Sequence, residues 1–153
     1  MKRIYGGVPG APEGTHYPSR AALSRAGVHL PVRAGICGNA LEGAASVVLS
    51  GGYEDDEDRG DVVVYTGQGG RDAASGRQVS NQTLVRGNGS LERSRVLGRP
   101  VRVVRGKGLC SRFAPKAGYR YDGLYRVAGS WKERGRAGHL VWRFRLEKVR
   151  SEG

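Results

Sequence analysis

The stretch HLVWRFRL, residues 139–146, indicates most clearly which class of fold this chain adopts. Its Leu, Trp, Phe and Leu residues alternate with His, Val and two Arg residues, and successive side chains of a β-strand point to opposite faces. We therefore predict a strand over His139–Leu146 with an aromatic face turned inward and a mostly basic face turned outward. Pro100–Arg105 repeats the alternation, with Val101 and Val103 on one face and Arg102 and Val104 on the other.

Other short segments of this kind recur along the chain. Each is bounded by Gly, Pro or Asp, residues that commonly end strands, and the candidates are Val28–Ile36, Ala45–Leu49, Asp61–Tyr65 and Leu124–Ala128. Several short strands with few helices favour a barrel or a strongly bent sheet. The fold class predicted is therefore mainly β, with a few short flanking helices.

Helical signal is sparse. One short helix is predicted over Arg20–Ala26, with Ser19 as its cap and Gly27 as its stop. A second is predicted around Asn88–Arg95, within a polar stretch, residues 73–95, that otherwise reads as an exposed loop.

The chain is most simply one domain, residues 1–153, because 153 residues suffice for one hydrophobic core. Cys37 and Cys110 lie far apart with no second cysteine near either, which excludes a zinc ribbon and predicts two reduced thiols. No apolar run reaches the roughly 18 residues of a membrane span, and the basic N-terminus lacks the apolar core of a secretory signal. A cytoplasmic location is expected.

Nearly all of the net charge of +12 comes from the C-terminal third of the chain. Residues 99–150 hold fifteen basic and three acidic side chains, interleaved with aromatic residues. Such one-sided charge favours a polyanionic partner, most simply nucleic acid, over a membrane surface. Basic residues in and after the predicted strands would contact phosphates: Arg102, Arg105, Lys107 and Arg143.

The stretch SGGYEDDEDRGDVVVYTGQGGRD, residues 50–72, contrasts with this charge, because it holds seven of the fourteen acidic residues, six of them between positions 54 and 61. A cluster of acidic residues is unexpected in a protein that binds nucleic acid. A pocket that recognises a base would account for it. Gly51 and Gly52 would let the backbone approach a planar ligand, Tyr53 and Tyr65 would stack on an extruded base, and a carboxylate would accept a hydrogen bond from the amino group of cytosine. An exposed acidic turn, a Mg²⁺ site and ordinary strand tyrosines remain alternatives.

No catalytic constellation stands out in the sequence. The three histidines lack the spacing of a metal pair or of an HNH nuclease motif, and no nucleophile elbow, phosphate-binding loop or deaminase Cys/His pattern occurs. We predict that this chain is not itself an enzyme and that it needs no cofactor or metal.

Five segments together resemble the SRA (SET- and RING-associated, or YDG) domain family: GVHLPVRAGICG (27–38), the 47–72 segment, RPVRVVRG (99–106), GYRYDGLYRV (118–127) and LVWRFRL (140–146). Their order and spacing hold from about Tyr5 to Lys148. The resemblance implies a PUA-like bent β-barrel that binds double-stranded DNA and flips out a modified cytosine. The sequence of these segments is most similar to bacterial members of the family. Several of those members lie beside an HNH nuclease domain in modification-dependent restriction enzymes.

The resemblance also implies roles for individual residues. Tyr53 and Tyr65 would sandwich the flipped base, and Asp56 would hydrogen-bond its Watson–Crick edge. Asp55 and the other acids would be turn or surface residues. The remaining pocket positions, with Thr66 beside the 5-methyl group, would be Ser50, Gly51, Gly52 and Thr66. Tyr121, Asp122 and Gly123 would be structural, and Arg71 and Asp72 would brace the following loop.

Two departures from the vertebrate members bear on specificity. Arg33 stands in the loop with Ala34 and Gly35 where those members insert a small apolar residue into the gap left by the flipped base, and arginine would fill it by stacking and hydrogen bonding. The loop at residues 73–80 is shorter than the vertebrate finger that checks the opposite strand, and Arg77 and Gln78 would replace part of it. We therefore expect no strict preference for hemimethylated sites.

The sequence thus favours a reader of 5-methylcytosine, with 5-hydroxymethylcytosine as a second candidate ligand, that works as the recognition module of a restriction system on the bacterial nucleoid. One alternative is that the chain is part of an HNH-type endonuclease whose catalytic domain, or an associated nuclease subunit, lies elsewhere. Another is an RNA-binding PUA-like domain.

Overall fold

The computed structural model describes residues 2–51, 56–69, 74, 80–84 and 86–150. Most of the regular structure is strand, as the sequence predicts. In chain order the elements are β1 His16–Tyr17, α1 Arg20–Arg25, β2 Ile36–Asn39, β3 Gly43–Leu49, β4 Glu57–Asp58, β5 Val62–Thr66, α2 Arg86–Leu97, β6 Pro100–Gly106, β7 Tyr119–Arg134 and β8 Leu140–Lys148.

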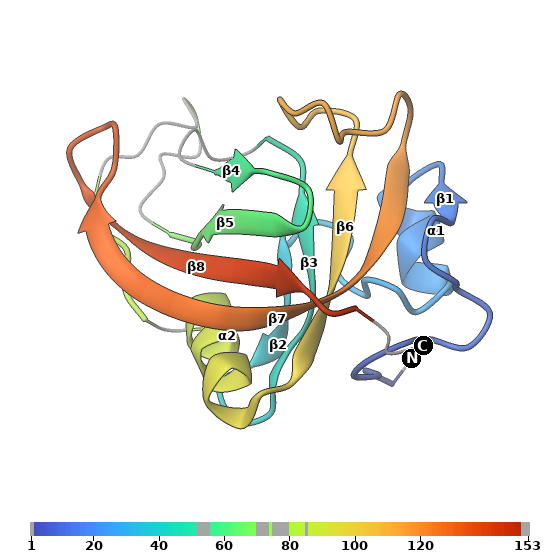
Figure 1. Ribbon diagram of the computed structural model, residues 1–153, viewed down its shortest axis with the longest axis horizontal. Helices are drawn as coiled ribbons and strands as arrows, with labels where there is room; N and C mark the ends of the chain where they lie inside the picture. The colour runs from blue at the N-terminus through green and yellow to red at the C-terminus, as the bar shows by residue number, and fades with distance from the viewer. Residues whose placement is uncertain (1, 52–55, 70–73, 75–79, 85, 151–153) are drawn as a thin grey trace.

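These strands form one strongly bent sheet in the order β2-β3-β6-β7-β8-β5-β4, with β1 paired to β7. Among the described strands, every pair is antiparallel except β3 with β6. The long β7 and its partner β8 curve together around the sheet, while α2 lies below them and α1 lies beside β1 (Figure 1). Register shifts within the β6–β7 and β7–β8 pairs accompany this bend. The predicted bent, mainly β fold is confirmed.

β6 separates two hydrophobic clusters. Val101 and Val103 belong to the larger cluster, whereas Val104 belongs to a smaller one that includes Leu23 of α1. The predicted alternation of β6 is therefore right, but both of its faces are buried.

The outward face predicted for β8 is wrong in part. Phe144 points inward as expected, yet Val141 and Arg143 on the other face are also buried. Arg143 is covered because its guanidinium lies between the carboxylates of Glu57 and Glu133.

Both predicted helices are confirmed. Ser19 caps α1 by accepting a hydrogen bond from the Ala22 amide at 3.1 Å, and Gly27 follows the helix with φ of 78°. α2 extends beyond the predicted bounds. It packs small buried residues against β3, where the Ser94 hydroxyl accepts from the Ala44 amide.

The strand predicted over Val28–Ile36 is wrong, because only its last residue lies in a strand. The amides of Val28 and His29 both donate to the Leu23 carbonyl at the end of α1, so they are not available to a sheet. Pro31 has no amide hydrogen. The apolar residues here pack a loop rather than a strand.

Cys37 is buried and Cys110 exposed, and both are free thiols, as predicted. Among the described residues, no helix is long and apolar enough to cross a membrane.

Candidate nucleic-acid interface

The acidic residue predicted to read a base lies against the end of β5. Asp56 immediately precedes β4, and its Oδ1 accepts a hydrogen bond from the Thr66 amide at 2.6 Å. β4 and β5 pair as a short hairpin, with Glu57 opposite Val64 and Asp58 opposite Val63. The structure therefore brings Asp56 and Thr66 together. Their predicted companions Gly52 and Tyr53 lie outside the described residues, as does Asp55.

Thr66 is fully buried, yet its hydroxyl is not satisfied. Among the described residues, Oγ1 has no hydrogen-bond partner. A buried hydroxyl left without a partner costs about 1–3 kcal/mol. The Asp56 carboxylate accepts a hydrogen bond from the Thr66 amide. A carboxylate acceptor and a hydroxyl without a partner therefore lie together at one end of β5.

Tyr65 lies one residue earlier on β5, and its side chain is 3% exposed within the larger cluster. Its hydroxyl donates to the Gly35 carbonyl at 3.4 Å, and a Cβ at Gly35 would lie 3.0 Å from that hydroxyl. Tyr65 therefore joins the predicted pocket strand to the predicted insertion loop.

Ser50 and Gly51 follow β3 and are exposed. Gly51 has φ of 81°, and a Cβ there would lie 2.5 Å from the Gly108 carbonyl oxygen. Glycine at position 51 is thus required by the chain's own packing against the loop after β6, independently of any ligand.

Hydrogen bonds fix the backbone of the predicted insertion loop, which includes Arg33, Ala34 and Gly35, while its side chains are exposed. The Arg20 guanidinium donates to the carbonyls of Pro31, Arg33 and Ala34, at 2.9, 3.3 and 2.6 Å. The Arg33 side chain is exposed. The loop therefore presents Arg33 from a fixed backbone, and Arg20 is a positioning residue that the sequence did not reveal.

His29 supports the same loop from within. Its Nε2 lies 2.8 Å from the Ala34 carbonyl and its Nδ1 lies 2.7 Å from the Ser46 hydroxyl. Because a carbonyl only accepts, Nε2 carries the hydrogen and Nδ1 accepts from Ser46. Burial lowers the pKa of His29 to about 4, with the positive charges of Arg20 and Arg102 acting in the same direction against the Ala34 hydrogen bond.

This pKa predicts how stability depends on pH. Between pH 6.5 and about 4 the unfolded chain protonates His29 while the folded protein does not, so the free energy of unfolding falls as pH falls through this window. The total loss expected is about 3 kcal/mol. His29→Gln can keep both hydrogen bonds without titrating, so urea unfolding across this range should show a flatter profile. An equally steep profile in the variant would contradict the assignment.

Three of the four residues predicted to contact phosphates are buried, and that prediction is wrong for them. Arg102 donates to the backbone carbonyls of Ile4, Gly6, Gly27 and Val28. Arg105 and Arg143 are paired with carboxylates. Arg102 and Arg105 of β6 and Arg143 of β8 are buried because the protein itself supplies their hydrogen-bond partners. Lys107 is exposed, and its phosphate contact stays a prediction.

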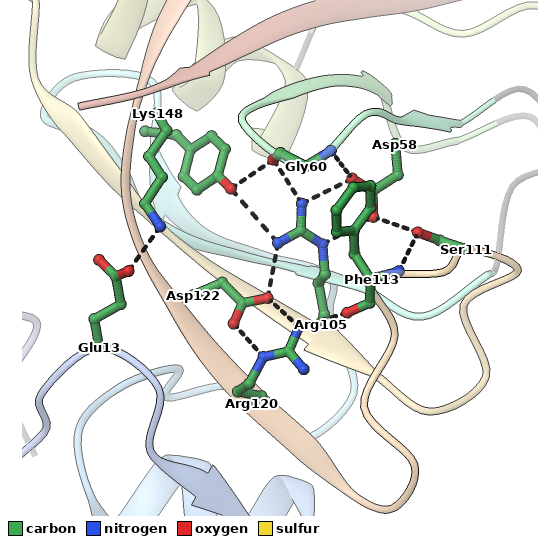
Figure 2. Close-up of polar contacts among 10 residues, drawn as sticks. Glu13, Asp58, Gly60, Arg105, Ser111, Phe113, Arg120, Asp122 and Lys148 are labelled. Carbon is green, nitrogen blue, oxygen red and sulfur yellow. Dashed lines mark hydrogen bonds and ion pairs between the residues drawn. The ribbon is translucent and has the colours of Figure 1, made fainter. Parts of the chain in front are cut away.

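The expectation that the other acids are turn or surface residues is also wrong for one of them. The Asp58 side chain is only 5% exposed and makes a bidentate ion pair with Arg105, through Nε at 2.8 Å and Nη2 at 2.7 Å (Figure 2). Asp122 binds the same guanidinium at 2.7 Å, and Ser111 donates to Asp58. Although burial raises it, the pKa of Asp58 is lowered overall by hydrogen bonds from Arg105, Gly60 and Ser111. Asp122 has the structural role that was predicted for it.

Arg77 and Gln78, predicted to face the opposite DNA strand, lie outside the described residues, as do Arg71 and Asp72. Among the residues that the structure describes, no group of three or more His, Cys, Asp or Glu side chains is placed to hold a metal ion.

Comparison with known proteins gives related chains along nearly the whole length. A family profile described as "SAD/SRA domain" matches residues 4–152. "E3 ubiquitin-protein ligase UHRF1" of Xenopus laevis is 41% identical over 165 residues, which cover 94% of this chain and 21% of that protein. The chain thus spans about a fifth of this curated relative.

Solved structures agree with these relatives. The "Modification dependent TagI restriction endonuclease" matches with a TM-score of 0.95 and 44% identity, over 98% of this chain and 54% of that chain. A SUVH5 SRA complex with fully methylated CG DNA matches with a TM-score of 0.83 and 39% identity, over 99% of this chain and 97% of that chain.

Proposed function

The chain belongs to the SAD/SRA domain family, and from that premise we propose that it reads 5-methylcytosine in double-stranded DNA by turning the modified base out of the helix. The mainly β fold is that of SRA structures. The methylated DNA named for the SUVH5 complex supports the choice of ligand. Residues 1–153 act as one recognition domain in this proposal.

The unpartnered Thr66 hydroxyl beside Asp56 is the observation that carries the proposal. A pocket that must recover the cost of unstacking a base needs hydrogen-bonding groups that are not satisfied by the protein alone. Asp56 would accept from the cytosine amino group, and Thr66 would meet a polar atom of the flipped nucleotide, with its methyl beside the 5-methyl group. Tyr53 and Tyr65 would stack on the base, while Ser50, Gly51 and Gly52 line the pocket.

Outside the pocket, Arg33 would enter the gap beside the orphaned guanine, carried by the loop that includes Ala34 and Gly35. Its guanidinium can both stack and donate in one plane. Arg77 and Gln78 would approach the opposite strand, and Lys107 would contact a phosphate.

We further propose that the chain is a reader and does not itself cut DNA. The likeness to a modification-dependent restriction endonuclease supports a place in a bacterial restriction system, acting on the nucleoid with a nuclease domain or subunit. Incubating methylated plasmid with the protein and Mg²⁺ or Mn²⁺ tests this division. Reproducible nicking would overturn the reader-only role.

Equilibrium binding to duplexes of one sequence, unmodified, hemimethylated, fully methylated and hydroxymethylated, tests the ligand. We expect about tenfold preference for methylated over unmodified DNA, because burying one methyl group contributes on the order of 1 kcal/mol and pocket shape adds to it. Structured RNA is included as a competitor. Equal affinity for all duplexes, or stronger binding to RNA, would contradict the proposal.

Thr66→Val tests the hydroxyl by itself. Removing a buried, unsatisfied hydroxyl without changing the side chain's shape should stabilise the free protein by about 1 kcal/mol in urea unfolding. The same change should weaken binding to the methylated duplex several-fold, because the nucleotide loses its partner. Thr66→Ser, which keeps the hydroxyl and loses only the methyl group, measures the methyl contact separately and should bind more tightly than the valine variant. Unchanged affinity in the valine variant would remove Thr66 from the pocket.

A further inference from the structure

We infer that Arg105 is a positioning residue for base recognition, which holds Asp56 in place through Asp58 without touching DNA. The inference rests on the proposed function and extends it to a residue buried behind the pocket. Asp58 lies two residues after Asp56, at the other end of β4. A cluster of polar groups converges on it (Figure 2).

The cluster fixes the turn between β4 and β5 at several points. The Arg105 guanidinium binds both carboxylate oxygens of Asp58 and also donates to the Gly60 carbonyl at 2.8 Å. The Tyr125 hydroxyl donates to the same carbonyl at 2.7 Å, and the Gly60 amide donates to Asp58 at 3.0 Å. The side chain and the backbone of this turn are therefore held by one buried guanidinium.

The Arg105 side chain is itself fixed by residues outside the hairpin. Asp122 on β7 accepts from its Nη1, and Arg120 pairs with that carboxylate in turn. The Phe113 ring packs against the guanidinium, and the distance from its centroid to Cζ of Arg105 is 5.5 Å. Burial alone would lower the pKa of Arg105, but the two aspartates raise it, so the guanidinium stays charged.

The hairpin needs such support, because β4 has only two residues and an isolated pair of this size is marginal in water. On one face of β4, Glu57 pairs with Arg143, and on the other face Asp58 pairs with Arg105. The Glu57 side chain is 52% exposed, so its ion pair is the weaker of the two.

Register decides where Asp56 points. A slip of one residue between β4 and β5 would turn every side chain of β4 to the other face. It would also remove Asp56 from the Thr66 amide, to which it is now bound. Arg105 can bind both oxygens of Asp58 only in the present register, so it selects the arrangement in which Asp56 can meet a base.

The test measures the Thr66 amide and DNA binding in the same variants. Arg105→Lys has three N–H donors on one atom, so it cannot make the four hydrogen bonds of the planar guanidinium to Asp58, Asp122 and Gly60. Asp58→Asn removes the charge with little change in shape. Arg102→Lys is the matched control, because Arg102 is equally buried on the same strand but binds only backbone carbonyls away from the hairpin. All variants are compared at neutral pH, and only variants that circular dichroism shows to be folded enter the comparison.

In Arg105→Lys and Asp58→Asn, we expect faster hydrogen exchange at the Thr66 amide and about five- to tenfold weaker binding to the methylated duplex. This corresponds to Asp56 being correctly placed in roughly a tenth to a fifth of the molecules. Binding to the unmodified duplex should change less than twofold, and Arg102→Lys should change neither measurement.

The inference is overturned if both folded variants keep wild-type exchange at Thr66, or if Arg102→Lys has the same effect as they do. If Arg105→Lys does not fold, Asp58→Asn decides alone. Failure of the proposed function has a different signature: the wild-type protein would not distinguish methylated DNA, while the exchange at Thr66 would still report whether Arg105 holds the hairpin.

Discussion

Asp56→Asn should lower affinity for a methylated duplex about 10- to 100-fold, while leaving nonspecific binding to unmodified DNA nearly unchanged. The reason lies in the hydrogen bond from the Thr66 amide to Oδ1. An asparagine must keep its oxygen on that amide, which places its NH₂ group where the second carboxylate oxygen was. That NH₂ group would face the cytosine amino group, donor against donor, and a buried donor left unpaired costs about 1–3 kcal/mol.

The measurement is a pair of dissociation constants, for methylated and unmodified duplexes, at one salt concentration, because phosphate contacts make both values depend on salt. The free variant should unfold at nearly the same urea concentration as the wild type. Intact discrimination in folded Asp56→Asn would mean that another group reads the base.

Tyr65→Ala should have two large effects. The ring is 3% exposed and belongs to the larger hydrophobic cluster, so its removal should destabilise the protein by about 3 kcal/mol. It should also remove one stacking face, and stacking of a base on an aromatic ring contributes about 1–3 kcal/mol. Affinity for the methylated duplex should fall at least about fivefold.

Phe144→Ala separates the two effects. Phe144 is paired with Tyr65 across β5 and β8, lies in the same cluster and is fully buried. It should cost similar stability in urea unfolding but leave discrimination intact in the folded protein, as should Tyr65→Phe, which keeps the ring. Wild-type discrimination in Tyr65→Ala would show that Tyr65 is only a core residue.

The strands with a clear two-residue period could be predicted from the sequence. Pro100–Arg105 falls within β6, and His139–Leu146 falls within β8 except for His139, because alternation is a local property of the chain. Val28–Ile36 has apolar content without such a period. Its residues pack against α1 and its amides bind the helix end, which only the tertiary structure reveals.

The pocket residues could be predicted because they belong to a sequence motif. The residues whose roles depend on burial could not. Asp56 and Thr66 meet as the family resemblance implies. Charge counts, however, assigned Arg102, Arg105 and Arg143 to DNA, because composition cannot tell a solvated arginine from one enclosed by its own partners. The Arg105–Asp58 pair joins residues 47 positions apart, so no local pattern could have distinguished Asp58 from the exposed Glu57 beside it.

Base flipping is the central claim, and fluorescence of 2-aminopurine next to the 5-methylcytosine in a duplex tests it most directly. Stacking quenches this base, so extrusion of its neighbour should raise the emission as protein is added, with a midpoint equal to that of binding. The account predicts this rise for the wild type and its loss in Asp56→Asn at a concentration where both proteins are bound. Full binding of the methylated duplex by the wild type with no rise in emission would contradict it.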